Sequence, residues 1–435
     1  MNIEKELSEN IDNPAELEGL YRKHSEEFES AFDSVFEKNS DSDILKTWNE
    51  RLHFKPLENE GFEKSSRQGE ILFVVLLSIV AAFGAGLPEF VDFVKTESYF
   101  VNMEFFLFIP PALYFIVKNS PKQRIITRIS ILFLISLIYI NFLAGNIITG
   151  EQNSVNKPNA ILSDALTLAY LHMPFFLWAL VGVSFIGNDL SNYTKRMDFL
   201  RLNGGVLVYF PILIISGAFL LYMSLALFQL IDVDIPNFIG DYLPFYAGFG
   251  VPIIATYLVT QSKAARNLAS TVSKILSPLV LVILIIYLVM IPISGENPFT
   301  DRDFLMVFNI VLIVVLGLTI FSISERGKSN LRLTGDYINF ALILVVLIID
   351  LVALSAILFR LTSYGLTPNR IAVLGINLLI FVNLAGVISN YVRFFQEKSG
   401  IKSIEVGIAR YLPVYAVWAA FVAFGFPLIF FFIGG

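Results

Sequence analysis

The chain has 435 residues, of which 55% are hydrophobic and only 16% are charged, whereas about a quarter of the residues in an average soluble domain are charged. Its mean hydropathy of +0.68 places it among membrane proteins rather than ordinary soluble enzymes. It contains no cysteine, which excludes disulfides, thiolate catalysis and zinc–sulfur sites.

The first 70 residues form a polar tail that holds 18 Asp and Glu against 9 Lys and Arg. The segment Asn13-Pro14-Ala15-Glu16 combines an N-cap residue, a proline at the first helical position and the glutamate of a capping box. It predicts a helix, along one face of which apolar residues recur from Leu17 to Val35. A shorter helix is predicted from Asp43. We therefore predict an acidic cytoplasmic helical hairpin over residues 1–55 and a linker over residues 56–69.

Two interpretations of this hairpin remain open. It packs only on itself or on the membrane body, or it docks a cytoplasmic protein partner through residues 13–53. The concentration of acid in the tail argues against adhesion to anionic lipid. It also argues against a nucleic-acid partner, because nucleic-acid binding needs a basic face.

Residues 70–435 contain eleven apolar runs, each long enough for a hydrocarbon core of about 30 Å. The predicted spans are 70–90, 99–118, 126–148, 161–187, 204–230, 241–261, 275–294, 303–324, 337–361, 369–392 and 410–433. The second and sixth runs are the weakest, because their prolines would kink or break a helix. The predicted fold class is an all-α, polytopic membrane bundle whose principal partner is the lipid bilayer.

Basic residues predict the orientation of these spans. The loops on one side hold 17 Lys and Arg, and the loops on the other side hold 5. Cytoplasmic loops carry the excess of Lys and Arg in membrane proteins, so the N-terminus is predicted inside and the C-terminus outside. All outer loops are short, which confines any function to the bilayer or its cytoplasmic side.

An acid near the middle of a span marks the first candidate site. A central charge costs roughly 2.5–3.5 kcal/mol, so Asp350 is expected to face a partner, a cavity or water. His172 lies at a similar depth and is expected either to pair with Asp350 or to bond a nearby carbonyl. Asn377 and Asn383 either bond neighbouring helices or line a polar cavity in which Asp350 could bind a proton or a cation. Asn141 and Asn309 are further amides in the outer half of the membrane.

Three charged residues near the predicted outer surface are candidates for a site at the mouth of the bundle. Glu104 lies about 7 Å below that surface, where its side chain can reach water. Arg360 and Arg370 flank a short outer turn, in which Thr367 is expected to cap the following helix. The turn is either a rigid capped hairpin or an anion-attracting site.

The turn sequence RLTSYGLTPNR, from Arg360 to Arg370, resembles the signature of an uncharacterised bacterial family, the domain of unknown function four-one-five-three. The tail is similar to that of members from Bacteroidota. The resemblance implies a polytopic protein of the bacterial plasma (inner) membrane. It implies no activity and no functional residue.

Enzyme motifs are not visible in the sequence, which contains no HExxH, Gly-x-Ser-x-Gly, P-loop or GxGxxG pattern. No cofactor and no metal site are predicted, and the chain has only three histidines. The prediction is therefore a non-enzymatic, permease-like or transporter-like membrane protein with a polar mid-membrane site around Asp350. The alternative is a regulatory or scaffolding membrane protein that recruits a cytoplasmic partner through its tail.

Overall fold

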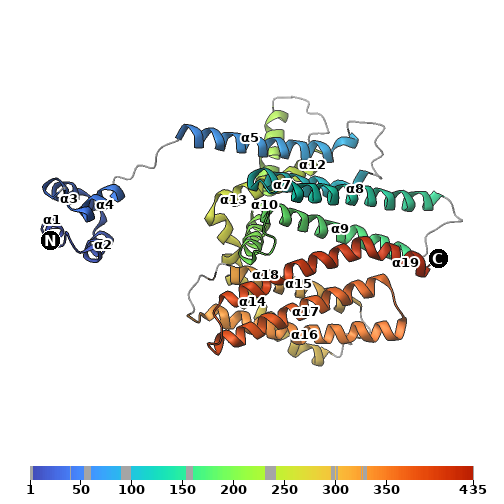
Figure 1. Ribbon diagram of the computed structural model, residues 1–435. Helices are drawn as coiled ribbons and strands as arrows, with labels where there is room; N and C mark the ends of the chain where they lie inside the picture. The colour runs from blue at the N-terminus through green and yellow to red at the C-terminus, as the bar shows by residue number, and fades with distance from the viewer. Residues whose placement is uncertain are drawn as a thin grey trace. The chain divides into compact units, whose positions relative to one another are not determined.

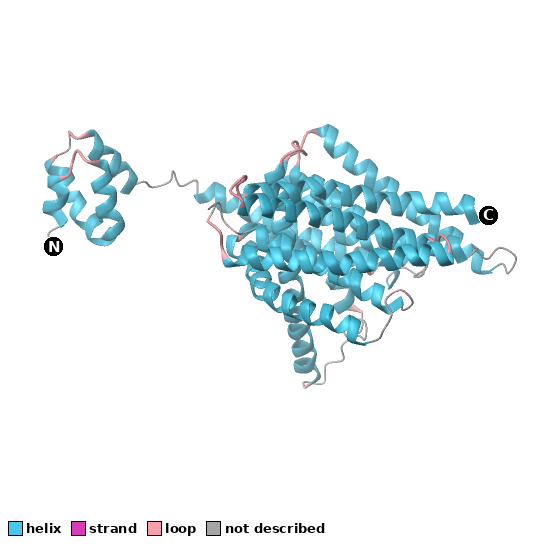
Figure 2. Cartoon of the chain, turned by 90° about the horizontal axis from the view of Figure 1, so that it is seen from below, coloured by secondary structure: helices cyan, strands magenta, loops and turns pink. Residues whose placement is uncertain are grey.

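The computed structural model describes residues 3–39, 41–52, 60–89, 99–152, 160–230, 242–294, 299, 302–324, 326 and 331–434. Within these ranges the regular secondary structure consists of helices (Figure 2). The chain divides into two compact units, Met1–Ile71 and Leu72–Gly435. The second unit is an all-α membrane bundle, and the protein is a multi-pass membrane protein.

Among the described residues 3–39 and 41–52, the N-terminal unit contains four helices rather than the two predicted: α1 (Ile3–Glu9), α2 (Pro14–Lys23), α3 (Ser25–Lys38) and α4 (Asp43–Leu52). Asn13 caps α2 as predicted, because its side chain accepts a hydrogen bond from the Glu16 amide. The prediction of one continuous helix to Val35 is wrong, because the backbone of His24 leaves the helical region and ends α2.

The core of this unit is formed by side chains of its own helices. Its fully buried apolar side chains are Leu7, Leu17, Phe28, Phe32, Val35 and Leu45. The predicted linker over residues 56–69 is also partly wrong, because helix α5 begins at Glu60. Residues 53–59 lie outside the described residues.

The remaining helices belong to the membrane unit (Figure 1). They are α5 (Glu60–Ala85), which starts in the N-terminal unit, α7 (Met103–Asn119), α8 (Gln123–Gln152), α9 (Ala160–Ile186), α10 (Tyr193–Gln229), α12 (Leu243–Ala247), α13 (Val251–Gln261), α14 (Lys263–Ser294), α15 (Arg302–Ser324), α16 (Thr334–Tyr364), α17 (Pro368–Phe395), α18 (Lys402–Ala420) and α19 (Phe426–Gly434). Among the described residues, nine stretches of helix are long and apolar enough to cross a membrane.

The second and sixth predicted spans are the two that fall short. Helix α7 has 17 residues and is therefore about 25 Å long. The sixth span is interrupted between α12 and α13 by a 3-10 turn over Gly248–Gly250. The last span is continuous, but a π-helical turn, Phe421–Gly425, joins α18 to α19.

Helix packing produces two large apolar cores in the membrane unit. One core is built around α14, α15, α16 and α17, with α16 packed against the other three. The other core is built around α7, α8, α9 and α13, with α9 packed against α7 and α8. Large apolar side chains on the outward faces remain exposed, as lipid contact requires, for example Leu207 on α10 at 65% exposure.

Contacts at the two ends of the helix bundle agree with the predicted alternation of sides. On the basic side, Asn119 Nδ2 donates to the Phe185 carbonyl at 2.8 Å and Arg332 pairs with Glu397 at 2.7 Å. On the opposite side, Asn369 Nδ2 donates to Asp164 Oδ2 at 2.8 Å. Each of these contacts joins helix ends or loops that the distribution of Lys and Arg predicts on the same side.

A close approach of two helices gives a test of this packing. A Cβ at Gly375 on α17 would lie 2.0 Å from the Trp418 ring on α18, whereas a Cβ at Gly386 on α17 would meet open space. Overpacking costs about 1–3 kcal/mol, which exceeds the gain of about 1 kcal/mol from replacing a helical glycine. We expect Gly375→Ala to lower the midpoint of thermal unfolding in detergent and Gly386→Ala to leave it unchanged or raise it. Equal midpoints would contradict the α17–α18 contact.

Candidate functional site

Asp350 lies near the middle of α16 and is fully buried. Its neighbours on the buried face, Val346, Ile349 and Ala353, are fully buried apolar residues of the core around α14–α17. Neither carboxylate oxygen has a hydrogen-bond partner among the described residues. An ionised carboxylate is very costly to bury without a partner, so an aspartate at this position is energetically unfavourable for packing alone.

A second unsatisfied polar group lies at a similar height on α15. The bond from Asn339 Nδ2 to Ser322 Oγ, 2.7 Å long, fixes the register of α16 against α15. At 1.5 Å per residue, Asp350 lies about 17 Å and Asn309 about 20 Å from this bond toward the opposite side. The buried Oδ1 atom of Asn309 has no partner in the described part of the chain.

Helix α17 contributes a third such group. The ring contact between Phe340 and Tyr391, with centroids 6.3 Å apart, fixes the register of α16 against α17. Asp350 lies about 15 Å and Asn377 about 21 Å from that contact. Asn377 is 1% exposed, and within the described ranges both polar atoms of its side chain are unbonded. We call Asp350, Asn309 and Asn377 the mid-membrane cluster.

The structure does not join His172 to Asp350. The His172 Nδ1 atom lies 2.8 Å from the Leu168 carbonyl of its own helix. Among the described residues, the His172 ring and the Asp350 carboxylate share neither a hydrogen bond nor an ion pair. Of the two arrangements predicted for His172, the structure therefore contains the bond to a nearby carbonyl.

Asn383 serves helix packing. Its Nδ2 atom donates to the Tyr415 hydroxyl on α18 at 2.9 Å. Two turns further along α17, Asn390 fits against Gly407 of α18, where an added Cβ would lie 2.6 Å from Asn390 Nδ2. This face of α17 therefore holds α18 and does not join Asn383 to Asp350.

The three predicted outer-mouth residues lie in separate environments, and Arg370 bonds the turn itself. Arg370 Nη1 donates to the Tyr364 and Gly365 carbonyls at 2.8 and 2.7 Å, and its amide donates to Thr367 Oγ1 at 3.3 Å. Gly365 has a φ of +80°, which favours glycine. The predicted capped hairpin is thus confirmed.

Arg360 and Glu104, the other two outer candidates, lie on different helices. Arg360 Nε donates to the Phe299 carbonyl at 3.0 Å. Glu104 lies in the first turn of α7, and its Oε1 atom is buried without a partner in the described part. No contact in the described residues gathers Arg360, Arg370 and Glu104 into one site.

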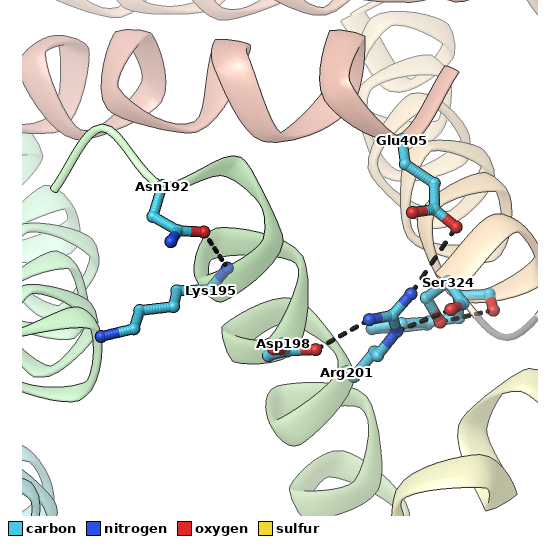
Figure 3. Close-up of polar contacts among 7 residues, drawn as sticks. Asn192, Lys195, Asp198, Arg201, Ser324 and Glu405 are labelled. Carbon is cyan, nitrogen blue, oxygen red and sulfur yellow. Dashed lines mark hydrogen bonds and ion pairs between the residues drawn. The ribbon is translucent and has the colours of Figure 1, made fainter. Parts of the chain in front are cut away.

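A junction on the basic side was not predicted from the sequence. Figure 3 shows Arg201 of α10 between Asp198 and Ser324, with Glu405 of α18 opposite it. The guanidinium bonds Asp198 Oδ1 at 2.7 Å and the Ser324 carbonyl at 2.6 Å, and lies 3.6 Å from Glu405 Oε1. One arginine therefore fastens α10, α15 and α18 together. The spacing of Asp198 and Arg201 predicts only their own pairing.

A second unpredicted contact is a buried ion pair. Arg326 Nε donates to Asp336 Oδ1 at 2.7 Å, and Asp336 Oδ2 accepts from the Leu333 amide at 2.8 Å. The side chains of Arg326 and Asp336 are 5% and 2% exposed. Helix α16 thus carries two buried aspartates, of which Asp336 is paired and Asp350 has no partner among the described residues.

Comparison of the chain with protein-family models, curated proteins and solved structures found no match. The family resemblance of the Arg360–Arg370 turn therefore stays a prediction. The case for a site at Asp350 consequently depends on the geometry of the mid-membrane cluster.

The two aspartates of α16 should respond in opposite ways to substitution by leucine, which has the same branched shape. Asp350→Leu removes a buried polar group without a partner and is expected to raise stability by about 1–3 kcal/mol. Asp336→Leu leaves the buried Arg326 uncompensated and is expected to cost about 3–5 kcal/mol. Thermal or denaturant unfolding of the purified protein measures both. A destabilised Asp350→Leu variant would show that Asp350 has a structural partner.

Proposed function

We propose that the protein is a permease-like membrane protein in which Asp350 binds and releases a proton during its cycle. The observation that supports this proposal is the fully buried carboxyl group of Asp350, both oxygens of which lack a partner in the described residues. Asn309 and Asn377 place further unbonded polar atoms at a similar height on two helices that pack against α16. A group without a fixed partner can exchange its proton or cation without first breaking an ion pair.

We interpret the structure as the closed state of this proposed cycle. Between Asn339 and Asp350 on α16 lie the fully buried residues Leu342, Ile343 and Val346. Access from the basic side requires this apolar layer to open. The π-helical turn Phe421–Gly425 and the proline-containing helices α9, α10 and α14 are places where helices can bend.

We further propose that the membrane is the bacterial plasma (inner) membrane and that the basic side is cytoplasmic. The excess of Lys and Arg on that side supports the orientation. The resemblance of the Arg360–Arg370 turn supports the bacterial assignment.

Proton movement through reconstituted protein tests the role of Asp350. In liposomes with an imposed membrane potential and an internal pH dye, we expect the native protein to move protons faster than empty liposomes. Asp350→Asn should reduce this flux at least about tenfold, because it removes the only acid of the mid-membrane cluster. Glu104→Gln, which neutralises a partly buried acid on α7, is the matched control and should retain the flux. Equal fluxes in Asp350→Asn and the native protein would contradict the proposal.

A second candidate function is recruitment of a cytoplasmic protein by the N-terminal unit. The unit has its own closed core, so it can present a folded surface. Glu18 on that surface is held by Arg51 and Arg22 at 2.5 and 2.7 Å, and the Arg51 hydrogen bond lowers the pKa of Glu18. The unit therefore keeps its surface charges in a defined arrangement at neutral pH.

Deletion of residues 1–55 separates the two functions. If the tail recruits a partner, its deletion should abolish co-purification of that partner and leave proton flux unchanged. Phe32→Asp, which disrupts the unit's core, should have the same effect as the deletion. An unchanged set of co-purifying proteins after deletion would exclude the recruitment function.

A further inference from the structure

A cavity of about 300 Å³ lies near the basic side, between α14, α15 and α16. Helix α14 contributes Lys274 and Ser277, α15 contributes Ser322, and α16 contributes Asp336 and Asn339. Apolar side chains complete the wall. A few polar groups in a largely apolar concavity are typical of a small-molecule site.

Two polar groups of this cavity lack a protein partner. Ser277 is 2% exposed, and its Oγ atom is unbonded within the described ranges. Asn339 is 3% exposed; its Nδ2 atom donates to Ser322 Oγ, whereas its Oδ1 atom has no partner among the described residues. The cavity thus offers one free hydroxyl donor and one carbonyl acceptor, both desolvated, and the Asn339 amide also interacts with the Tyr391 hydroxyl.

The charge of the cavity is positive. Arg326 and Asp336 both line the cavity, and their mutual ion pair cancels their charges. Lys274 is an exposed residue, and its ammonium has no hydrogen-bond or ion-pair partner in the described part of the chain, so the described lining residues carry one positive charge that no ion pair cancels. A ligand with one anionic group is therefore favoured.

A second cavity, of about 310 Å³, differs in the bonding of its polar lining residues. It lies where α9 ends and α10 begins, and its polar lining is already bonded. Asn119 donates to the Phe185 carbonyl, Asn188 accepts from the Lys122 amide, and Lys195 Nζ donates to the Ile186 carbonyl at 3.2 Å. Of these two cavities, the one at Lys274 combines a charge without an ion-pair partner with buried atoms that are unbonded among the described residues.

We propose that the cavity at Lys274 binds a phosphate ester that carries a free hydroxyl, such as a glycerol phosphate group. The Lys274 ammonium and the Ser277 hydroxyl donate to the phosphate oxygens, and Asn339 Oδ1 accepts from the ligand hydroxyl. The volume equals that of about ten water molecules, which suits a headgroup rather than a whole lipid. Ile275 and Leu276 beside Lys274 are 61% and 40% exposed and offer an apolar surface for acyl chains. The ligand is either the headgroup of an anionic lipid or a free glycerol phosphate, and the proposal does not depend on proton transport.

Binding to the purified full-length protein in detergent tests this proposal. Short-chain phosphatidylglycerol is titrated and counted by native mass spectrometry, and glycerol 3-phosphate is titrated separately by calorimetry. Lys274→Gln and Ser277→Ala should each weaken binding by about tenfold, because each removes a donor to a charged group. Lys402→Gln, at an exposed lysine on the same side, is the matched control and should bind like the native protein.

The two titrations distinguish the sources of the ligand. Binding of the lipid without binding of glycerol 3-phosphate indicates a headgroup site. Binding of glycerol 3-phosphate alone indicates a soluble ligand. Both outcomes support the proposal if Lys274→Gln and Ser277→Ala weaken them. Ser277→Ala removes a single oxygen, so retained folding, checked by the unfolding midpoint, is expected. Absence of binding of both compounds, or equal binding by all three variants, would overturn the proposal.

Discussion

Each helix end leaves backbone carbonyls that have no partner within the helix and that side chains or water can bond. Here basic side chains bond many of them. Lys195 bonds the last residue of α9, Arg201 the last residue of α15, Arg332 the last residue of α17 and Arg370 the last residue of α16. A cation at a helix C-terminus also opposes the negative end of the helix dipole. Three of these four contacts lie on the basic side, so the residues that orient the chain also fasten its helices.

The buried acid in the middle of α16 differs from the bonded charged groups at these helix ends. Near the basic end of the bundle, the buried Asp336 is bonded to Arg326 and to the Leu333 amide. In the middle, Asp350 has no partner among the described residues. Because an unpaired acid lowers the stability of a core, its presence is better explained by a role in binding than by packing.

The sequence predicts the fold class well because apolar runs and Lys/Arg asymmetry act over whole segments. It locates the long helices of the described residues, although α5, α10 and α14 begin ten to twelve residues before their predicted starts. The two weak runs are those that the structure shortens or breaks. Local chemistry also predicts the capped turn at Thr367 and Gly365.

What the sequence could not predict is which helix faces meet. Depth alone could not distinguish a His172–Asp350 pair from a histidine bonded to its own helix. Depth also could not separate Asn383, which holds α18, from Asn377, which is unbonded within the described ranges. The contacts of Arg201 with Ser324 and Glu405 connect residues more than a hundred positions apart, and no local pattern encodes them. Asn309 was recognised as an amide in the outer half, but its level with Asp350 follows only from the register of α15 against α16.

The protonation of Asp350 tests the central claim most directly. Infrared difference spectra of the protein in lipid, recorded across a pH titration, show the carbonyl band of protonated carboxyl groups. The account predicts a band that changes with pH, is absent in Asp350→Asn and persists in Glu104→Gln. A spectrum of Asp350→Asn identical to that of the native protein at every pH would contradict the account.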